Sequence, residues 1–164
     1  DPSHATAHNS LGNLLSDDVR KDYAGAERMF RKAIELDPSR ATAHNSLGDL
    51  LQTVRKDYAG AELHYRKAIE LDPECAEAHN NLGILLKNVR KDYDGAERHY
   101  RKAIELDPKL TAARWNLSLI LEEQKNDIPG AVKLMEECVH LGGCTGFDGE
   151  QRLATLRRKL EAST

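Results

Sequence analysis

The chain contains short segments in which apolar residues recur every three or four positions, as they do on one face of a helix. One segment predicts an amphipathic helix over residues 41–53. Its apolar positions are Ala43, Leu47, Leu50 and Leu51. Asp57 follows as a typical helix N-cap and precedes a second apolar stripe. That stripe consists of Tyr58, Ala61, Tyr65, Ala68 and Ile69. The pattern therefore predicts two helices joined by a short polar turn.

This two-helix pattern recurs along the chain with a period of about 35 residues. The four copies occupy residues 1–36, 37–71, 72–106 and 107–141. The first three copies are nearly identical, and the fourth has diverged. Because each unit can bury its apolar face only against its neighbours, the repeat predicts an all-α stack of helix pairs.

The segment after the repeats has a different composition. Residues 142–149 contain four glycines and predict a linker, and residues 150–164 predict one more helix with Leu153, Leu156 and Leu160 on one side. The last unit of a stack exposes an apolar face, so we interpret this helix as a cap. A basic helix on a membrane surface is the alternative, which the lack of an aromatic anchor disfavours.

Several repeated positions resemble the motif of the tetratricopeptide repeat family. In the second copy they are Leu47, Gly48, Tyr58, Ala61, Tyr65, Ala68 and Pro73. The resemblance covers residues 1–141. It implies a right-handed α-solenoid of antiparallel helix pairs, with four tetratricopeptide-like repeats and the C-terminal helix as a cap. Two features depart from the family pattern. His8, His44 and His79 replace the usual tryptophan of the first helix, and the turn between the helices is one residue longer.

Charge and composition argue against several classes of partner. The net charge is -3, whereas a nucleic-acid-binding domain usually carries a strong basic excess. Arg-Lys pairs recur along the chain, but acids such as Glu35 and Glu70 lie close to them and favour a solvated surface. No apolar run approaches the roughly 20 residues of a membrane span, so we expect no membrane partner. Asp1 resembles an internal position, and we expect the native N-terminus to lie upstream.

The cysteines bear on the cellular compartment. Cys75, Cys138 and Cys144 are an odd number without a C-x-x-C pair. This favours reduced thiols and a cytoplasmic location. A disulfide between Cys138 and Cys144 is the less favoured alternative.

The seven histidines are the first candidates for metal binding or catalysis. His8, His44 and His79 recur once per repeat, which places them about 10 Å apart on stacked helices. They cannot share an ion whose ligands each lie about 2 Å away. We expect these three to pack in place of an aromatic residue, with His64 and His99 on the outer surface. No nucleophile–base pair or phosphate-binding loop is evident, so the sequence predicts a protein that is not an enzyme and uses no metal or cofactor.

Differences between the second and third copies indicate which surface varies. In the first helix they are Thr42/Glu77, Ser46/Asn81, Asp49/Ile84, Gln52/Lys87 and Thr53/Asn88. Four of these pairs form one stripe opposite the leucines. An exposed surface that is free to drift would explain this. In the resembled family, the same stripe lines a concave groove that holds peptides. The resemblance therefore implies a peptide-binding groove at Asn9, Asn13, Asn45, Asp49, Glu77, Asn80, Asn81, Ile84, Lys87, Asn88, Trp115, Asn116 and Leu119.

The chemistry of these positions narrows the partner. Co-chaperone members of the family bind a C-terminal carboxylate with Lys and Arg, which the matching positions lack. We therefore expect no carboxylate-clamp chaperone tail. The asparagines instead resemble the peptide-binding asparagine ladder of O-GlcNAc transferase and kinesin light chain. Only half of it is present, because Ser10 and Ser46 replace the asparagine in the first two copies. Trp115 either anchors a partner beside Ile84 and Leu119 or packs under the C-terminal helix.

These features predict a non-catalytic protein–protein interaction scaffold that binds an extended peptide. Two alternatives stay open. The chain could be a structural building block that self-associates end to end, or the repeat arm of a larger protein with a catalytic domain outside this sequence.

Overall fold

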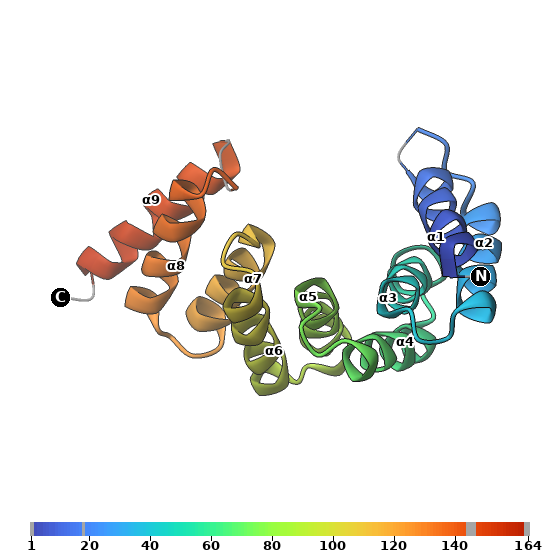
Figure 1. The fold of residues 1–164 in the computed structure, drawn as a ribbon. Coiled ribbons are helices and arrows are strands. Elements are labelled where there is room, and N and C mark those ends of the chain that lie inside the picture. The colour runs from blue at the N-terminus through green and yellow to red at the C-terminus, as the bar shows by residue number, and fades with distance from the viewer. Residues whose placement is uncertain (1, 18, 144–146, 163–164) are drawn as a thin grey trace. The chain divides into compact units, whose positions relative to one another are not determined.

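The computed structural model describes residues 2–17, 19–143 and 147–162, and every regular element within these ranges is helical (Figure 1). The chain divides into two compact units, residues 1–85 and residues 86–164. Unit 1 contains α1 (Pro2–Ser16), α2 (Tyr23–Leu36), α3 (Ala41–Leu50), η1 (Leu51–Arg55), α4 (Tyr58–Leu71) and α5 (Ala76–Leu85). Unit 2 contains η2 (Leu86–Arg90), α6 (Tyr93–Leu106), α7 (Thr111–Glu123), α8 (Ile128–His140) and α9 (Phe147–Ala162).

Within unit 1, consecutive helices pack side by side, and α1, α3 and α5 also contact one another in that order. Within unit 2, α6, α7, α8 and α9 pack in sequence. The expected pairs of helices joined by short turns are therefore present in each unit, and the all-α prediction is confirmed.

Aspartate caps begin the second helix of every pair. The side chains of Asp22, Asp57, Asp92 and Asp127 each accept a hydrogen bond from the backbone N–H three residues later, at 2.8 to 3.0 Å. Such a cap satisfies an N–H group that would otherwise lack a partner, and it stabilises a helix by about 1 kcal/mol. The predicted cap at Asp57 is confirmed.

The end of the first helix differs from the prediction. The α-helical part of α3 ends at Leu50, and the chain continues as a π-helical turn to Arg55, two residues beyond the predicted limit. Lys56 then adopts a left-handed conformation with φ of 58°, and its N–H bonds to the carbonyl of Leu51. The repeat is one residue longer than the usual family unit, and a π-turn accommodates one more residue than an α-turn. We therefore attribute this wide turn to the extra residue.

Small residues allow the two helices of a pair to approach closely. A Cβ atom on Gly48 would lie 2.8 Å from the Tyr65 ring, and Tyr65 and Ala61 are completely buried. Glycine and alanine therefore occupy the positions where the two helices lie closest. Tyr58, which the sequence placed in the same apolar stripe, is instead 37% exposed because it begins α4 beside the solvated turn.

The histidines only partly follow the prediction. His44 is buried in the packed face of α3, as expected. His64 does not lie on the outer surface. It is half-buried, and its Nδ1 lies 3.0 Å from Nδ1 of His44. His64 directly precedes Tyr65, so the two side chains lie about 100° apart around the axis of α4. The side of α4 that contains His64 faces α3.

Helix α9 begins at Phe147, three residues before the predicted start at residue 150. Leu153 and Leu156 are buried, and α9 packs against α8. Its apolar side is therefore covered by protein, as expected for a cap.

The expectation of three reduced thiols is wrong in one case. Cys75 is a free, buried thiol, whereas Cys138 is disulfide-bonded. Cys144 lies outside the described residues.

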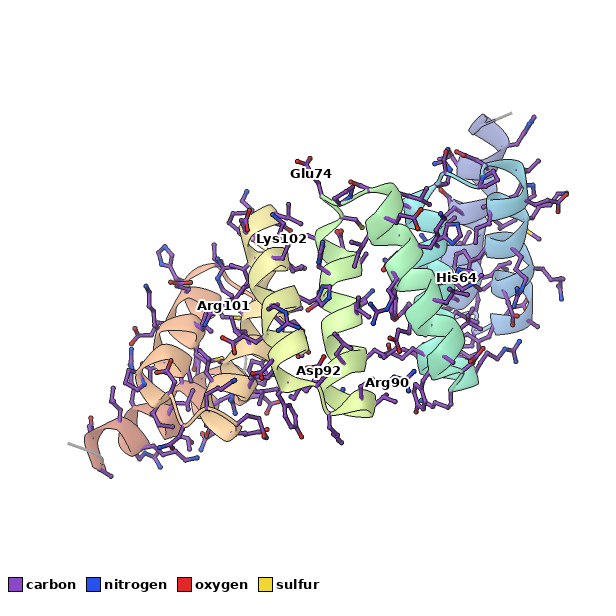
Figure 2. All side chains as sticks on the ribbon, turned by 90° about the horizontal axis from the view of Figure 1, so that it is seen from below. His64, Glu74, Arg90, Asp92, Arg101 and Lys102 are labelled. Carbon is purple, nitrogen blue, oxygen red and sulfur yellow. The ribbon has the colours of Figure 1, made fainter. Side chains whose placement is uncertain are left out.

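Ion pairs cover the exposed side of the second helices. Arg pairs with the Glu four residues earlier in α2, α4 and α6, and Lys pairs with the Glu three residues later. The pairs are Arg31–Glu27, Arg66–Glu62, Arg101–Glu97, Lys32–Glu35, Lys67–Glu70 and Lys102–Glu105. Figure 2 shows Arg101 and Lys102 at the surface of α6. The Arg-Lys pairs in these helices therefore belong to a solvated, charge-balanced surface, as expected.

Candidate partner-binding groove

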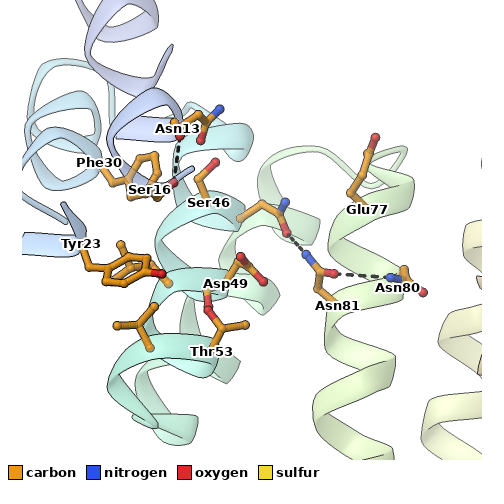
Figure 3. Close-up of a pocket in the computed structure, with 13 residues that line it drawn as sticks. Asn13, Ser16, Tyr23, Phe30, Ser46, Asp49, Thr53, Glu77, Asn80 and Asn81 are labelled. Carbon is orange, nitrogen blue, oxygen red and sulfur yellow. Dashed lines mark hydrogen bonds between the residues drawn. The ribbon is translucent and has the colours of Figure 1, made fainter. Parts of the chain in front are cut away.

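Unit 1 contains a groove between its first helices, shown in Figure 3. It has a volume of about 300 Å³. The lining residues come from α1, α2, α3, η1 and α5. They are Asn13, Ser16, Tyr23, Phe30, Asn45, Ser46, Asp49, Leu50, Thr53, Val54, Glu77, Asn80 and Asn81. Six of the predicted site residues, Asn13, Asn45, Asp49, Glu77, Asn80 and Asn81, are thus brought together.

Helical periodicity explains why α3 contributes most of the groove. Ala43, Leu47 and Gly48 are buried on one side of this helix. Asn45 and Asp49 are four residues apart and therefore lie above one another on the opposite side. A helix that buries one apolar face necessarily presents its polar face to the groove.

Amide side chains make a connected chain across the groove. Nδ2 of Asn81 donates to Oδ1 of Asn45 at 3.1 Å, and Nδ2 of Asn80 donates to Oδ1 of Asn81 at 3.4 Å (Figure 3). The first bond joins α3 to α5. Nδ2 of Asn45 makes no hydrogen bond with any residue that the structure describes. Because an amide has two N–H donors and an oxygen with two lone pairs, the pair keeps unused donors and acceptors at the groove.

The charged lining of the groove is entirely acidic. It consists of Asp49 and Glu77, and no Lys, Arg or His lines the groove. The Asp49 carboxylate is open to solvent, but surrounding protein displaces part of its hydration, and this desolvation raises its pKa. Glu77 accepts a weak hydrogen bond from Sγ of Cys75 at 3.8 Å.

Two predicted residues of unit 1 do not line this groove. Asn9 is half-buried, and its Oδ1 is enclosed without a hydrogen-bond partner among the described residues. Ile84 is half-buried near the end of α5. Neither position supports a groove contact directly.

The other predicted residues belong to unit 2. Lys87 and Asn88 lie on η2, and Trp115, Asn116 and Leu119 lie on α7. Desolvation lowers the pKa of Lys87. Asn116 and Leu119 are half-buried.

Trp115 lies beside the C-terminal helix. Its ring is 5.5 Å from the guanidinium carbon of Arg152 on α9, a cation–π distance. Trp115 also lines a cavity of about 390 Å³ together with Glu122, Asp148, Gln151, Arg152, Thr155 and Leu156. This geometry favours packing beside the cap. The half-buried ring still borders open space, so a partner contact at Trp115 stays a prediction.

Some groove residues were missed by the sequence interpretation. Ser46 and Thr53 belong to the variable stripe, and their polar character was a usable signal. Tyr23 and Phe30 line the groove from α2, although their positions in the repeat are those of packing residues. Their partial access to the groove depends on tertiary packing.

Comparison with known families identifies the chain. A model described as tetratricopeptide repeat matches residues 18–71 and 89–139, and a second model, described as TPR repeat, matches residues 55–89. The chain belongs to the tetratricopeptide repeat family. Such repeats are in general scaffolds for protein interaction and not catalytic domains. No curated protein sequence matches the chain.

Solved structures with the same fold include other tetratricopeptide solenoids. The pilF protein of Pseudomonas aeruginosa has a TM-score of 0.84 and 28% identity, over 98% of this chain and 70% of that one. MamA has a TM-score of 0.69 and 24% identity, over 87% and 80% of the two chains. The first repeat domain of Spaghetti (RPAP3), solved with an HSP90 peptide, has a TM-score of 0.67 and 21% identity, over 74% and 94%. The last two likenesses concern the fold alone.

Among the described residues, no three His, Cys, Asp or Glu side chains are grouped in a way that could hold a metal ion. Within the same residues, no helix combines the length and the apolar character needed to cross a bilayer.

Proposed function

We propose that this tetratricopeptide protein is a non-catalytic scaffold whose unit 1 groove binds an extended segment of a partner protein. The observation that carries the proposal is the groove itself, where polar side chains and the rings of Tyr23 and Phe30 border the Asn45–Asn81 pair. Its volume of about 300 Å³ lies at the lower end of ligand sites and suits a few residues of extended chain.

The amides support recognition of a peptide backbone. The unused N–H groups of Asn45 can donate to a peptide carbonyl, and Asn81 can accept from a peptide N–H. Because every peptide offers these groups, the amides contribute affinity with little sequence selectivity. Each neutral hydrogen bond contributes about 1 kcal/mol net, so neighbouring side chains must supply the selectivity.

The groove does not support binding of a free C-terminal carboxylate. Recognition of a carboxylate by charge-assisted hydrogen bonds needs Lys or Arg, and neither lines the groove. Asp49 and Glu77 would repel it. This distinguishes the proposed partner from a carboxylate-clamp chaperone tail.

A display library of random dodecapeptides, panned on the whole chain, tests the proposal. We expect a selected set of peptides that bind the double variant Asn45→Ala, Asn81→Ala at least tenfold more weakly. Gln124→Ala removes an exposed amide from unit 2 and serves as the matched control, with unchanged binding. Melting temperatures of all variants establish that each is folded. The absence of any selected peptide, or equal binding by the double variant, contradicts the proposal.

A second candidate function is end-to-end self-association, and one observation favours it. Leu11 and Leu14 on α1 are 41% and 45% exposed, whereas their repeat equivalents Leu47 and Leu50 on α3 are buried. An unpaired apolar helix face favours association. Light scattering of the wild-type chain and of Leu11→Ser, Leu14→Ser measures this. A monomer at high concentration in both cases contradicts it.

A further inference from the structure

The carboxylate of Asp49 differs from other carboxylates that the fold partly desolvates. Glu27 in α2 pairs with Arg31 at 3.0 Å and with Arg55 at 2.9 Å. Burial alone would raise the pKa of Glu27, but the hydrogen bonds and charges of the two guanidinium groups outweigh it and lower the pKa. Asp49 has no such neighbour, and desolvation raises its pKa.

In unit 2, cations also accompany a carboxylate that the fold partly desolvates. Glu122 in α7 is only 11% exposed, and it pairs with Arg152 at 2.7 Å and with Lys159 at 2.6 Å. Its pKa is lowered, because the hydrogen bonds and charges of these two cations outweigh the opposing effect of burial. A desolvated carboxylate is costly unless a cation accompanies it, and the fold supplies that cation to Glu27 and Glu122. No ion pair joins Asp49 to any residue within the described part of the chain.

The surroundings of Asp49 suit a cation from outside the chain. Tyr23 lines the same groove with its ring, and Glu77 adds a second negative charge on α5 (Figure 3). A lysine or arginine side chain can place its aliphatic part along an aromatic ring and its charged end against a carboxylate. The lining contains no cation that would repel it.

We propose that the unit 1 groove selects partner segments that present a lysine or arginine side chain to Asp49. This inference rests on the proposed function, because it assumes that a peptide occupies the groove. The amides then bind the backbone of the segment, and Asp49 determines the charge of the side chain beside it. Acidic segments are rejected, since they would place like charges next to Asp49 and Glu77.

The library selection gives the first test. We expect peptides selected on the wild-type chain to be enriched in Lys or Arg at one position relative to the unselected library. We expect peptides selected on Asp49→Asn to show no such enrichment. The substitution keeps the size of the side chain and removes only its charge, and the exposed position tolerates it without unfolding.

A direct measurement follows on one selected peptide. Two fluorescein-labelled forms, one with Lys at the enriched position and one with Gln, are titrated with protein and followed by fluorescence anisotropy. Charge-assisted hydrogen bonds are roughly twice as strong as neutral ones, and we expect the wild-type chain to prefer the Lys form about tenfold. Asp49→Asn should bind both forms equally, and Asp49→Lys should prefer a third form with Glu. Glu70→Gln neutralises an exposed acid on α4, outside the groove, and should keep the tenfold preference.

The outcomes separate the two proposals. Peptides that depend on Asn45 and Asn81 but show no preference for Lys or Arg support groove binding and overturn the charge inference. A tenfold preference that persists in Asp49→Asn also overturns it, because the cation then binds elsewhere. If no peptide is selected at all, the proposed function fails and this inference fails with it.

Discussion

The two faces of α3 differ in their surroundings, which restrict the choice of side chain in different ways. On one face, Ala43, Leu47 and Gly48 are buried against neighbouring helices. On the other face, Asn45 and Asp49 line a groove that is open to solvent. In the next copy of the repeat, Leu82 and Gly83 occupy the positions of Leu47 and Gly48, so the packed face is unchanged. On the groove face, Ile84 occupies the position of Asp49. Stability therefore depends on the first face, and the partner choice that we propose depends on the second.

We expect the largest difference in the free energy of unfolding when a carboxylate is placed on each of the two faces of α3. Leu47→Asp puts an unpaired carboxylate where the side chain is 1% exposed, and we expect a loss of about 3–5 kcal/mol in the free energy of unfolding. Ser46→Asp, one residue earlier on the groove side, should change it by less than about 1 kcal/mol. Urea unfolding followed by circular dichroism measures both. Equal losses for the two variants would mean that the groove face is also packed.

The next prediction concerns close packing at Gly48. A Cβ atom there would lie 2.8 Å from a ring carbon of the fully buried Tyr65. We expect Gly48→Ala to cost about 1–3 kcal/mol through overpacking, although alanine recovers up to about 1 kcal/mol of helix propensity. Thermal unfolding measures the net effect. A stabilised variant would show that the ring moves aside freely, and the packed face would then be less constrained than the structure indicates.

A smaller effect is expected from the histidine pair at the edge of the packed face. Nε2 of His44 lies 3.3 Å from the carbonyl oxygen of Pro38, so this nitrogen carries the proton and donates it. Nδ1 of His44 then accepts from Nδ1 of His64. Burial is the main cause that lowers the pKa of both histidines below the usual 6.5. The unfolded chain therefore binds more protons, and stability falls as the pH decreases from above 6.5 through the lowered values.

His64→Gln isolates this effect, because glutamine can still donate to His44 but does not titrate. Its unfolding free energy should decrease less steeply than that of the wild type between pH 7.5 and 5. Gln124→Ala, at an exposed position in unit 2, changes no titratable group and should leave the steepness unchanged. If the wild type and His64→Gln have the same slope, the histidine pair does not contribute to the pH dependence.

The smallest effect is expected on the exposed ion pairs of the second helices. Arg31 is 58% exposed in its pair with Glu27, and solvent screens such pairs strongly. We expect Arg31→Ala to change the free energy of unfolding by at most about 0.5 kcal/mol, and less at high salt. Urea unfolding at low and high sodium chloride measures this. A loss above about 1.5 kcal/mol would show that this surface contributes to stability in the way that the packed face does.

The features that could be predicted from sequence are those decided by residues close together in the chain. The cap at Asp57 needs only an N–H three residues away, and the buried side of α3 needs only helical periodicity. The π-turn after Leu50 was not predicted, because several residues there would also fit an α-helix. His64 was misplaced because its burial depends on His44, twenty positions away in the sequence.

Only part of the candidate groove was predicted, because only some of its positions are determined by residues close together in the chain. Its α3 and α5 positions followed from one polar stripe, whereas Tyr23 and Phe30 required knowledge of how α2 lies against α1 and α3. The missing cation at Asp49 could not be deduced either. Lys and Arg are abundant in the sequence, and only the fold shows that they pair with Glu27 and Glu122 instead.

The comparison of α1 with α3 separates what the local sequence determines from what the tertiary structure determines. Both helices contain the segment Ala-Thr-Ala-His-Asn-Ser-Leu-Gly, and this local pattern suffices to make each a helix with one apolar face. Yet Leu47 is 1% exposed and Leu11 is 41% exposed. Periodicity specifies which side of a helix is apolar, because it depends on the spacing of neighbouring residues. Whether that side is buried depends on a second helix from elsewhere in the chain, since apolar surface leaves water only when another surface covers it.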